Sequence, residues 1–306
     1  MNMKVRGRTD ILLILCGLLV WFLADADRIR SAAAQALDLC ARSVIPAMFP
    51  FMVVSGLLVS LGFGAWISPH LAGCMTPLFR LPGCASSALL LGLVGGYPIG
   101  AQTAAGLYRD RLLTREEAQR LLTFCNNANP VFLISVLGAG VFGSVRVGVW
   151  LWLIHVASAL LTGLVFRKSG HSTARQDVLR SFPCQAISLA GAFAEAMRTA
   201  LNGTLAVCAS VVLFYVLATP FRALGGLAGA ALTGTVELFS LVPLLSPDRA
   251  GFILAAACAG WGGFSVLFQT IAVLEGSGLH PVSCLKGKLV QSLSSGLLAA
   301  AVSFLL

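Results

Sequence analysis

Two stretches of this sequence share one pattern, a glycine pair followed by an aromatic residue and, five positions later, Gln-Thr. They are GGYPIGAQT at residues 95–103 and GGFSVLFQT at residues 262–270. A shift of 167 positions relates them, and the same shift places Leu107 opposite Leu274. Glycines interrupt an otherwise apolar run in both stretches, with a proline in the first, which predicts broken helices. We therefore predict a two-fold internal repeat that contains two broken or re-entrant segments.

The composition of the chain indicates a membrane protein. Hydrophobic residues make up 58% of the 306 residues and charged residues only 11%, with a mean hydropathy of +0.89. Soluble proteins carry about 25% charged residues, so this composition excludes a soluble enzyme, a disordered tail protein and a secreted disulfide scaffold. We predict an all-α polytopic membrane protein, embedded in the lipid bilayer through about nine segments of roughly 20 residues each.

The formal net charge of +9 is also explained by a membrane. Basic residues cluster in the N-terminus and in residues 108–120 and 167–180, at the ends of apolar runs. Cytoplasmic loops of membrane proteins carry such an excess of Lys and Arg. None of the clusters is interleaved with the aromatic residues that stack on bases, so we expect no nucleic-acid partner.

Motifs for catalysis and metal binding are missing from the sequence. The nine cysteines include no C-x-x-C pair, and H-E-x-x-H, G-x-S-x-G and P-loop motifs do not occur. His155 stands alone in its apolar span, which favours a packing role. We therefore expect no enzyme activity, no metal and no cofactor.

Polar segments divide the chain into four parts. The apolar run at residues 11–23, followed by Ala24-Asp25-Ala26, also fits a cleaved signal peptide. We favour an uncleaved first helix, because the downstream chain is itself predicted to lie in the membrane. The parts are an N-terminal helix with an amphipathic linker at 1–43, the first repeat at 44–166, a polar cytoplasmic linker at 167–182 and the second repeat at 183–306.

The two broken segments form the predicted substrate site. Hydrocarbon cannot satisfy an open backbone, and paired broken segments in two repeats point to a transporter's binding site near the bilayer midplane. Gln102 and Gln269 would supply amides from equivalent positions. Alternatively, the glycines only allow close helix packing and the glutamines bond neighbouring helices. The predicted substrate-binding residues are Gly95, Gly96, Tyr97, Pro98, Gln102, Thr103, Asn126, Asn127, Asn129, Gly262, Gly263, Ser265, Gln269 and Thr270.

Two further polar features lie inside apolar runs. Three asparagines precede Pro130, which should break the helix that a T-x-x-E capping box begins at Thr114. Their amides would complete the site or, alternatively, clamp neighbouring helices. Glu237 is the one carboxylate well inside a predicted span, residues 227–245. It is a candidate for coupling transport to a proton or cation, unless it forms a salt bridge near the interface.

Several motifs carry a resemblance to a known family. They are SVIPAMFPF at 43–51, GLVGGYPIGA at 92–101, FCNNANP at 124–130 and GGFSVLFQ at 262–269. These runs resemble the sporulation integral membrane proteins of the YlbJ, or SpoVV, family, which carry a nucleoside-recognition Gate domain. The resemblance covers most of the chain from about residue 40. Asn129 departs from it, since family members tend to have a small residue there.

The resemblance implies a fold related to concentrative nucleoside transporters and a role in endospore formation. It implies dipicolinate as the cargo, moved from the mother cell across the outer forespore membrane, whereas the Gate description implies nucleosides. A non-transporting scaffold or receptor for spore envelope assembly is a third possibility. We expect an anion to be held by helix N-termini, with Arg120 or Lys288 only at the mouth of the site. Coupling and a homo-oligomeric state stay open.

Overall fold

The computed structural model describes residues 2–167 and 188–304, and its regular elements in those ranges are all helices. The prediction of an all-α protein is therefore confirmed for the described residues. Four helical stretches are long and apolar enough to cross a membrane, namely Ala26–Ser60, Val145–Val165, Leu189–Leu217 and Arg249–Leu274. Shorter apolar helices lie between them. The predicted number of about nine embedded segments is not confirmed.

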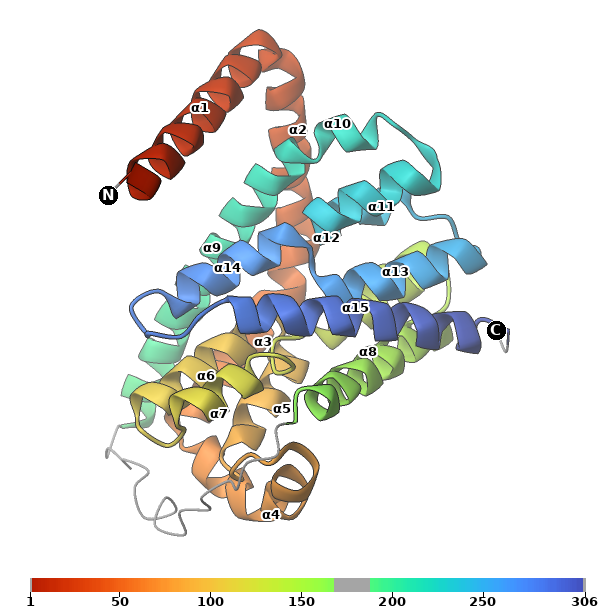
Figure 1. Ribbon diagram of the computed structural model, residues 1–306. Helices are drawn as coiled ribbons and strands as arrows, with labels where there is room; N and C mark the ends of the chain where they lie inside the picture. Colours follow the sequence, from red (N-terminus) through yellow and green to blue (C-terminus); the bar gives the residue numbers. More distant parts are fainter. Residues whose placement is uncertain (1, 168–187, 305–306) are drawn as a thin grey trace.

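The chain forms two successive sets of helices (Figure 1). The predicted polar linker at 167–182 lies, apart from its first residue, outside the described residues. The first set comprises α1 (Asn2–Ala24), α2 (Ala26–Leu39), the π-helical segment η1 (Cys40–Val44), α3 (Ile45–Ser60), α4 (Phe63–Phe79), α5 (Ala85–Gly95), α6 (Ile99–Arg109), α7 (Arg115–Leu121), the π-helical segment η2 (Phe132–Val141) and α8 (Val145–Val165). The second comprises α9 (Leu189–Leu217), α10 (Thr219–Arg222), α11 (Gly226–Val236), α12 (Leu238–Leu241), the short 3₁₀ segment η4 (Val242–Leu244), α13 (Arg249–Trp261), α14 (Gly263–Leu274) and α15 (Val282–Val302).

Both halves repeat one order of elements. After a long helix, α2–α3 or α9, each has a hairpin, α5–α6 or α11–α12, and then a broken helix, α7–η2 or α13–α14. Each half ends on a helix of 21 residues, α8 or α15. These two final helices pack against one another, with the hydroxyls of Ser158 and Ser295 only 2.7 Å apart. The described parts of the two halves therefore share an order of elements, but the predicted repeat is not confirmed.

The hairpins turn back on themselves at their breaks. In the first, the thiol of Cys84 before α5 lies 3.7 Å from the carbonyl of Leu112 beyond α6, so the two ends meet. In the second, residues at the start of α11 and at the end of η4 line one shared cavity. The predicted return of residues 86–107 to their own side agrees with the first hairpin. The prediction of a continuous span at 227–245 is wrong, because extended backbone at Glu237 ends α11 and reverses the chain.

The structural repeat has a different register from the one predicted. α8 begins at Val145 and α15 at Val282, a shift of 137 positions rather than 167. The break at Gly96 lies in a hairpin, whereas the break at Gly262 lies in a broken helix, whose counterpart is the unwound segment 122–129. The predicted equivalence of residues 95–103 and 262–270 is not confirmed. Glycine pairs occur at both kinds of break, so they mark a break without showing which one it is.

Close backbone contact accounts for glycines around the unwound segment. Gly92 of α5 and Gly100 of α6 both face the carbonyl oxygen of Cys125, and a β-carbon at either position would collide with it. Gly287 of α15 faces the carbonyl of Thr123 in the same way. The unwound segment therefore lies between the first hairpin and α15 at a distance that only glycine allows. Packing explains these three glycines fully.

Local sequence signals on either side of this segment are confirmed. The side chain of Thr114 accepts a hydrogen bond from the N–H of Glu117 at 3.2 Å, and the Glu117 carboxylate accepts one from the N–H of Thr114 at 2.8 Å. This capping box begins α7, as its spacing predicts. Pro130 begins the next helical stretch, where its missing N–H costs no helical bond.

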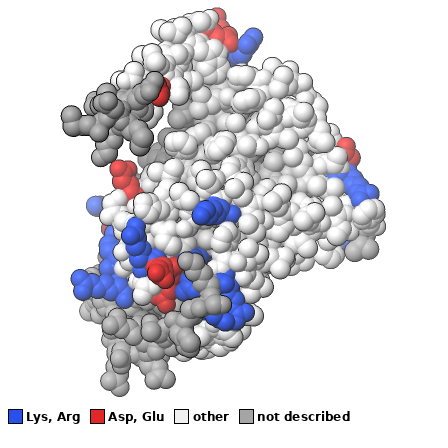
Figure 2. All heavy atoms as spheres, viewed as in Figure 1, with Lys and Arg blue, Asp and Glu red and all other residues white. Residues whose placement is uncertain are grey.

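Charged side chains leave a broad belt of the surface nearly free. Figure 2 shows Lys and Arg gathered mainly at the lower left, over the α6–α7 region, with smaller groups at the top and right. Exposed Arg109, Arg111 and Arg115 belong to the loop there. A surface with few charges between charged ends is compatible with a bilayer, and the basic end agrees with a cytoplasmic loop at residues 108–120.

Candidate functional site

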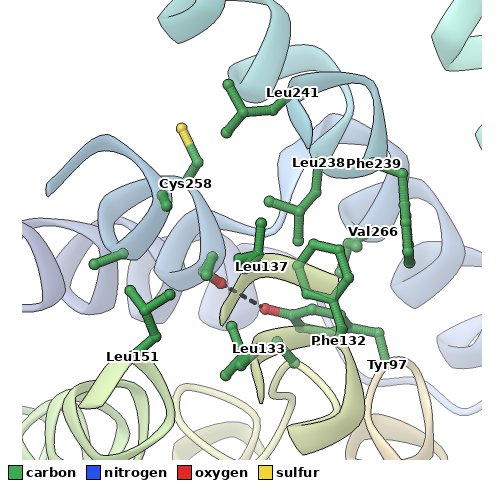
Figure 3. Packing of buried hydrophobic residues seen from close by; sticks show 14 of the residues in the cluster. Tyr97, Phe132, Leu133, Leu137, Leu151, Leu238, Phe239, Leu241, Cys258 and Val266 are labelled. Atoms are coloured by element: carbon green, nitrogen blue, oxygen red, sulfur yellow. Dashed lines mark hydrogen bonds between the residues drawn. The ribbon is translucent and has the colours of Figure 1, made fainter. Parts of the chain in front are cut away.

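All four helix breaks meet around one interior cavity. The polar lining comes from each of the four segments: Tyr97 of the first hairpin, Asn129 of the first broken helix, Glu237 of the second hairpin, and Ser265 and Gln269 of the second broken helix. Figure 3 shows Tyr97, Phe132, Leu238, Phe239 and Val266 gathered in this region. The remaining lining residues are Met48, Ala128, Val207 and Val211.

The cavity is narrow in this structure. The space open to the centre of a water molecule is about 20 Å³, which is enough for roughly one water molecule. Pockets for organic ligands enclose about 300–1,000 Å³. An organic substrate could therefore enter only after the surrounding segments move apart.

Asn129 satisfies both breaks of the first half. The carbonyls in the last turn of α5 have no partner within the helix. Asn129 Nδ2 donates to the carbonyls of Val94 at 3.1 Å and Gly95 at 3.3 Å. Its Oδ1 accepts from the N–H of Val131 at 2.7 Å. Asn129 thus supports the fold as well as lining the cavity.

Tyr97 and Trp261 satisfy helix ends in the second half. The Tyr97 hydroxyl donates to the carbonyl of Ala259, in the last turn of α13, at 3.0 Å, drawn as a dashed line in Figure 3. Trp261 Nε1 donates to the carbonyl of Thr235, in the last turn of α11, at 2.9 Å. Because hydrocarbon offers no hydrogen-bond partners, such contacts allow helices to stop inside a membrane. The ends of α5, α11 and α13 are therefore each held by a side chain from another break.

Glu237 lies in the interior without a cationic partner. Its side chain is 1% exposed, and Oε2 accepts from the N–H of Ser240 at 2.5 Å, which caps α12. The hydroxyl of Ser265 lies beside the carboxyl group. Among the described residues the ion pairs are Asp25–Arg28, Asp27–Arg30 and Asp38–Arg42, and none includes Glu237. The alternative of a salt bridge to a loop Arg is not seen, and an intramembrane carboxyl of this kind is functional by default.

Most of the predicted site residues lie at or near the cavity. Asn126 and Asn127 are buried behind it: Asn126 Nδ2 donates to Thr270 Oγ1 at 2.9 Å, and Asn127 Nδ2 donates to the carbonyl of Phe124 at 2.9 Å. The residues that line the cavity are Tyr97, Asn129, Glu237, Ser265 and Gln269, and those that form the adjacent breaks are Gly95, Gly96, Pro98, Gly262 and Gly263.

Gln102 and Thr103 do not line the cavity. The side chain of Gln102 is exposed on α6, and the Thr103 hydroxyl donates to the carbonyl of Ile99, one turn earlier, at 2.9 Å. Gln269, by contrast, is buried, and its Oε1 has no hydrogen-bond partner. The two glutamines differ because one follows a hairpin break and the other follows a break in a crossing helix.

The expected position of Lys288 at the mouth of the site is wrong. This residue of α15 is 4% exposed, with Nζ 3.2 Å from the Tyr97 hydroxyl and 2.8 Å from Gln291 Oε1. Arg120 instead donates to the carbonyl of Arg80 at the end of α4, at 3.1 Å. A signal for Lys288 exists in the sequence: Cys284, Lys288, Gln291 and Ser295 repeat at helical spacing and form one buried polar face of α15.

Two helix N-termini face the cavity. Ser265 and Val266 belong to the first turn of α14, and Phe132 to the first turn of η2, and all three line the cavity. The N-terminal end of a helix carries a partial positive charge and free N–H groups, which favour anions. In residues 2–167 and 188–304, no group of three His, Cys, Asp or Glu side chains is placed to hold a metal ion. The residues that line the cavity can bind a ligand through hydrogen bonds and electrostatic attraction.

Paired helix breaks around a narrow cavity, two from each half of the chain, define a transporter-like membrane protein. The comparisons with known proteins agree with this class. Residues 41–146 match the Gate family, described as nucleoside recognition. Over 139 residues the chain is 32% identical to the sporulation integral membrane protein YlbJ of Bacillus subtilis (strain 168). The predicted resemblance to the YlbJ family and its Gate domain is confirmed.

The extent of these matches is limited. The alignment with YlbJ covers 45% of this chain and 34% of YlbJ, so the chain spans about a third of the length of this curated relative. The Gate match begins at residue 41 and ends at residue 146, just after η2, so it includes the first hairpin and the first broken helix. No solved structure matches the chain. The Gate match therefore does not extend to the second half.

Proposed function

We propose that this chain is a membrane transporter of a small polar organic anion, and that the anion is dipicolinate passing from the mother cell toward the forespore. The observation that carries the proposal is the meeting of four helix breaks, two from each half, at one narrow cavity. Such breaks let helix halves move around a central site, as alternating access requires. The name of YlbJ, a sporulation membrane protein, supports the setting. The location that we propose is the outer forespore membrane.

The chemistry of the cavity supports an anion that carries a planar ring. Carboxylate oxygens would accept hydrogen bonds from the first N–H groups of α14 and η2. The hydroxyl of Ser265 and the amide of Gln269 add uncharged donors. The rings of Phe132 and Phe239 form an edge-to-face pair with centroids 4.7 Å apart at the same cavity, and a pyridine ring could pack against the side of this pair.

Glu237 is the group that we assign to coupling. An ionised carboxylate beside a bound anion repels it, whereas a protonated carboxyl can donate a hydrogen bond to it. Proton binding at Glu237 would therefore favour substrate binding, so that the two move together. The buried position of Glu237 beside Ser265, without a cation, supports this assignment over a purely structural ion pair.

A nucleoside is the second candidate substrate. The Gate description refers to nucleoside recognition, and the amides of Asn129 and Gln269 beside aromatic rings could bind a base by hydrogen bonds and stacking. A nucleoside is neutral, however, and gains less from helix N-termini than a dicarboxylate does. We therefore rank it second.

Uptake into proteoliposomes tests the proposal. The full chain would be reconstituted and supplied with labelled dipicolinate, with and without an imposed proton gradient, and in a parallel series with labelled uridine. We expect dipicolinate to accumulate above the level of protein-free vesicles, the gradient to increase the rate, and excess unlabelled uridine not to compete.

The opposite results distinguish the alternatives. Accumulation of uridine alone would assign the nucleoside function. If a folded, monodisperse preparation moved neither compound, transport of both candidate cargoes would be excluded, and the scaffold or receptor function would become the better explanation. That function predicts that a sporulation defect follows changes in the exposed loop of Arg109, Arg111 and Arg115 rather than changes at the cavity.

A further inference from the structure

Lys288 is a buried cation to which the proposed function gives no role. It lies on α15 at 4% exposure, and no ion pair among the described residues includes it. An ammonium group has three N–H donors, and two neutral oxygens receive them, Tyr97 Oη at 3.2 Å and Gln291 Oε1 at 2.8 Å. A buried charge without an opposite charge is unfavourable. Its burial in the protein interior points to an anionic partner in another state of the protein.

Tyr97 lies between Lys288 and the cavity. Its side chain lines the cavity, while the centre of its ring is 4.7 Å from Lys288 Nζ. Its hydroxyl accepts from that ammonium and donates to the carbonyl of Ala259, which holds the ring in place (Figure 3). Rotation of this one side chain would open the ammonium to the cavity and remove one of its two acceptors.

Gln291 fixes the ammonium in position. Its Oε1 accepts from Lys288, and its Nε2 donates to Asn127 Oδ1 at 2.9 Å. Asn127 belongs to the unwound segment of the first broken helix, which also contributes Asn129 to the cavity. The Lys288 ammonium is therefore linked through Gln291 to the segment that contributes Asn129 to the cavity.

We propose that Lys288 is the carboxylate-binding residue of the substrate site, and that a substrate carboxylate replaces the Tyr97 hydroxyl at its ammonium group when Tyr97 turns away. The proposal rests on the transport function above and specifies its substrate class as an organic acid with at least one carboxylate. A compact ammonium charge forms a strong, charge-assisted hydrogen bond with a carboxylate oxygen. A neutral nucleoside would gain nothing comparable there.

Two ligands of similar shape, one charged and one neutral, test the proposal. Binding of dipicolinate and of its uncharged analogue pyridine-2,6-dicarboxamide to the full chain would be measured at equilibrium. We expect the unmodified protein to prefer the dicarboxylate, and Lys288→Met to reduce that preference at least about tenfold, the size of one charged hydrogen bond. Lys288→Arg should keep most of it. Lys286→Met, two residues away and exposed on the same helix, should leave it unchanged.

The preference is a ratio of two affinities, so partial unfolding of a variant does not alter it. If the ratio of dicarboxylate affinity to diamide affinity were unchanged in Lys288→Met, the proposal would be overturned. If that variant still took up dipicolinate, the transport function would be unaffected. If Lys288→Met lost the preference for the dicarboxylate but the unmodified protein took up no dipicolinate, the result would support Lys288 as an anion-binding residue and overturn the transport function. Binding of neither probe by the unmodified protein would overturn the role of Lys288.

If Lys288→Met does not fold, a second variant tests whether a carboxylate replaces the Tyr97 hydroxyl. Tyr97→Phe removes the hydroxyl that competes for the ammonium, so dicarboxylate binding should tighten about fivefold, the size of one neutral hydrogen bond. Binding of the diamide should not tighten. If Tyr97→Phe did not raise the affinity for the dicarboxylate relative to that for the diamide, the result would contradict the replacement of the Tyr97 hydroxyl by a carboxylate.

Discussion

The two halves of the protein hold their helix breaks together with different side chains. In the first half, a β-carbon built on Gly96 of the hairpin would meet Asn129 of the broken helix. In the second half, one built on Gly263 of the broken helix would meet the backbone around Glu237 of the hairpin. Asn129 satisfies both breaks of its half through three hydrogen bonds. In the second half, Glu237 and Trp261 satisfy the two helix ends at the hairpin break, and Tyr97 of the first half satisfies the end of α13 at the other break.

The two halves also differ in how tightly they pack and in which polar groups they leave without partners. Backbone packing against Cys125 leaves no free volume at Gly92 and Gly100 in the first half. In the second half Gln269 is buried at the cavity with an oxygen that has no partner, and Glu237 lies there without a cation. We infer that the first half is the more rigid framework and that the second half supplies most of the groups that respond to a ligand.

The largest expected effect is at the glycine contact of the first half. Gly100→Ala places a β-carbon onto the carbonyl of Cys125. Because that carbonyl is part of the backbone and cannot easily move aside, we expect the free energy of unfolding to fall by about 3 kcal/mol, or the protein to fail to fold. The matched control is Gly106→Ala on the same helix, where nothing lies within 4 Å, and it should be neutral or stabilise by up to about 1 kcal/mol. Thermal unfolding followed by size-exclusion chromatography measures both. Equal melting temperatures would show that the first half is not rigid.

The next effect compares the side chains that satisfy the helix ends. Asn129→Ala leaves two buried carbonyls and one N–H without partners, so we expect a loss of about 2–3 kcal/mol. Trp261→Phe removes a single bond to the carbonyl of Thr235 and should cost only about 1 kcal/mol. Thermal stability of the two purified variants gives the comparison. A greater loss in Trp261→Phe would reverse the assignment of the framework to the first half.

A smaller effect, on ligand binding rather than folding, separates the two glutamines. Gln269→Ala removes a cavity amide and should weaken dipicolinate binding about tenfold, or about 1.4 kcal/mol. Gln102→Ala changes an exposed residue of α6 and should leave binding unchanged. Titration of both variants tests this. Equal losses would restore the symmetric site that the sequence repeat predicts.

The smallest effect on stability is expected at Glu237. Glu237→Gln keeps an oxygen that can cap Ser240, so stability should change by less than about 1 kcal/mol, while uptake should lose its response to a proton gradient. Glu237→Ala also removes the cap and should cost about 1 kcal/mol more. Uptake with and without the gradient, beside thermal unfolding, checks both. A preserved gradient response in Glu237→Gln would remove Glu237 from the coupling role.

Three of the four breaks were predictable from sequence, and one was not. Gly96 with Pro98, Pro130 and Gly262 interrupt helices through their own backbone preferences, which act locally. At Glu237 no glycine or proline marks the break, and the reversal there depends on packing against Gly263. The apolar run of residues 227–245 therefore predicts a single span that the fold divides. The shared Gln-Thr pair likewise predicts symmetry between side chains that face different surroundings.

The sequence by itself determined that this chain lies in a membrane, is helical and interrupts its helices at particular residues. Hydropathy, glycine and proline carry that information because their effects extend over one or two turns. Only the tertiary structure decided which breaks meet, that Gln269 lines the cavity and Gln102 does not, and that Lys288 lies behind Tyr97. Those facts depend on contacts between residues far apart in the chain, which form only when the two hairpins pack against the broken helices.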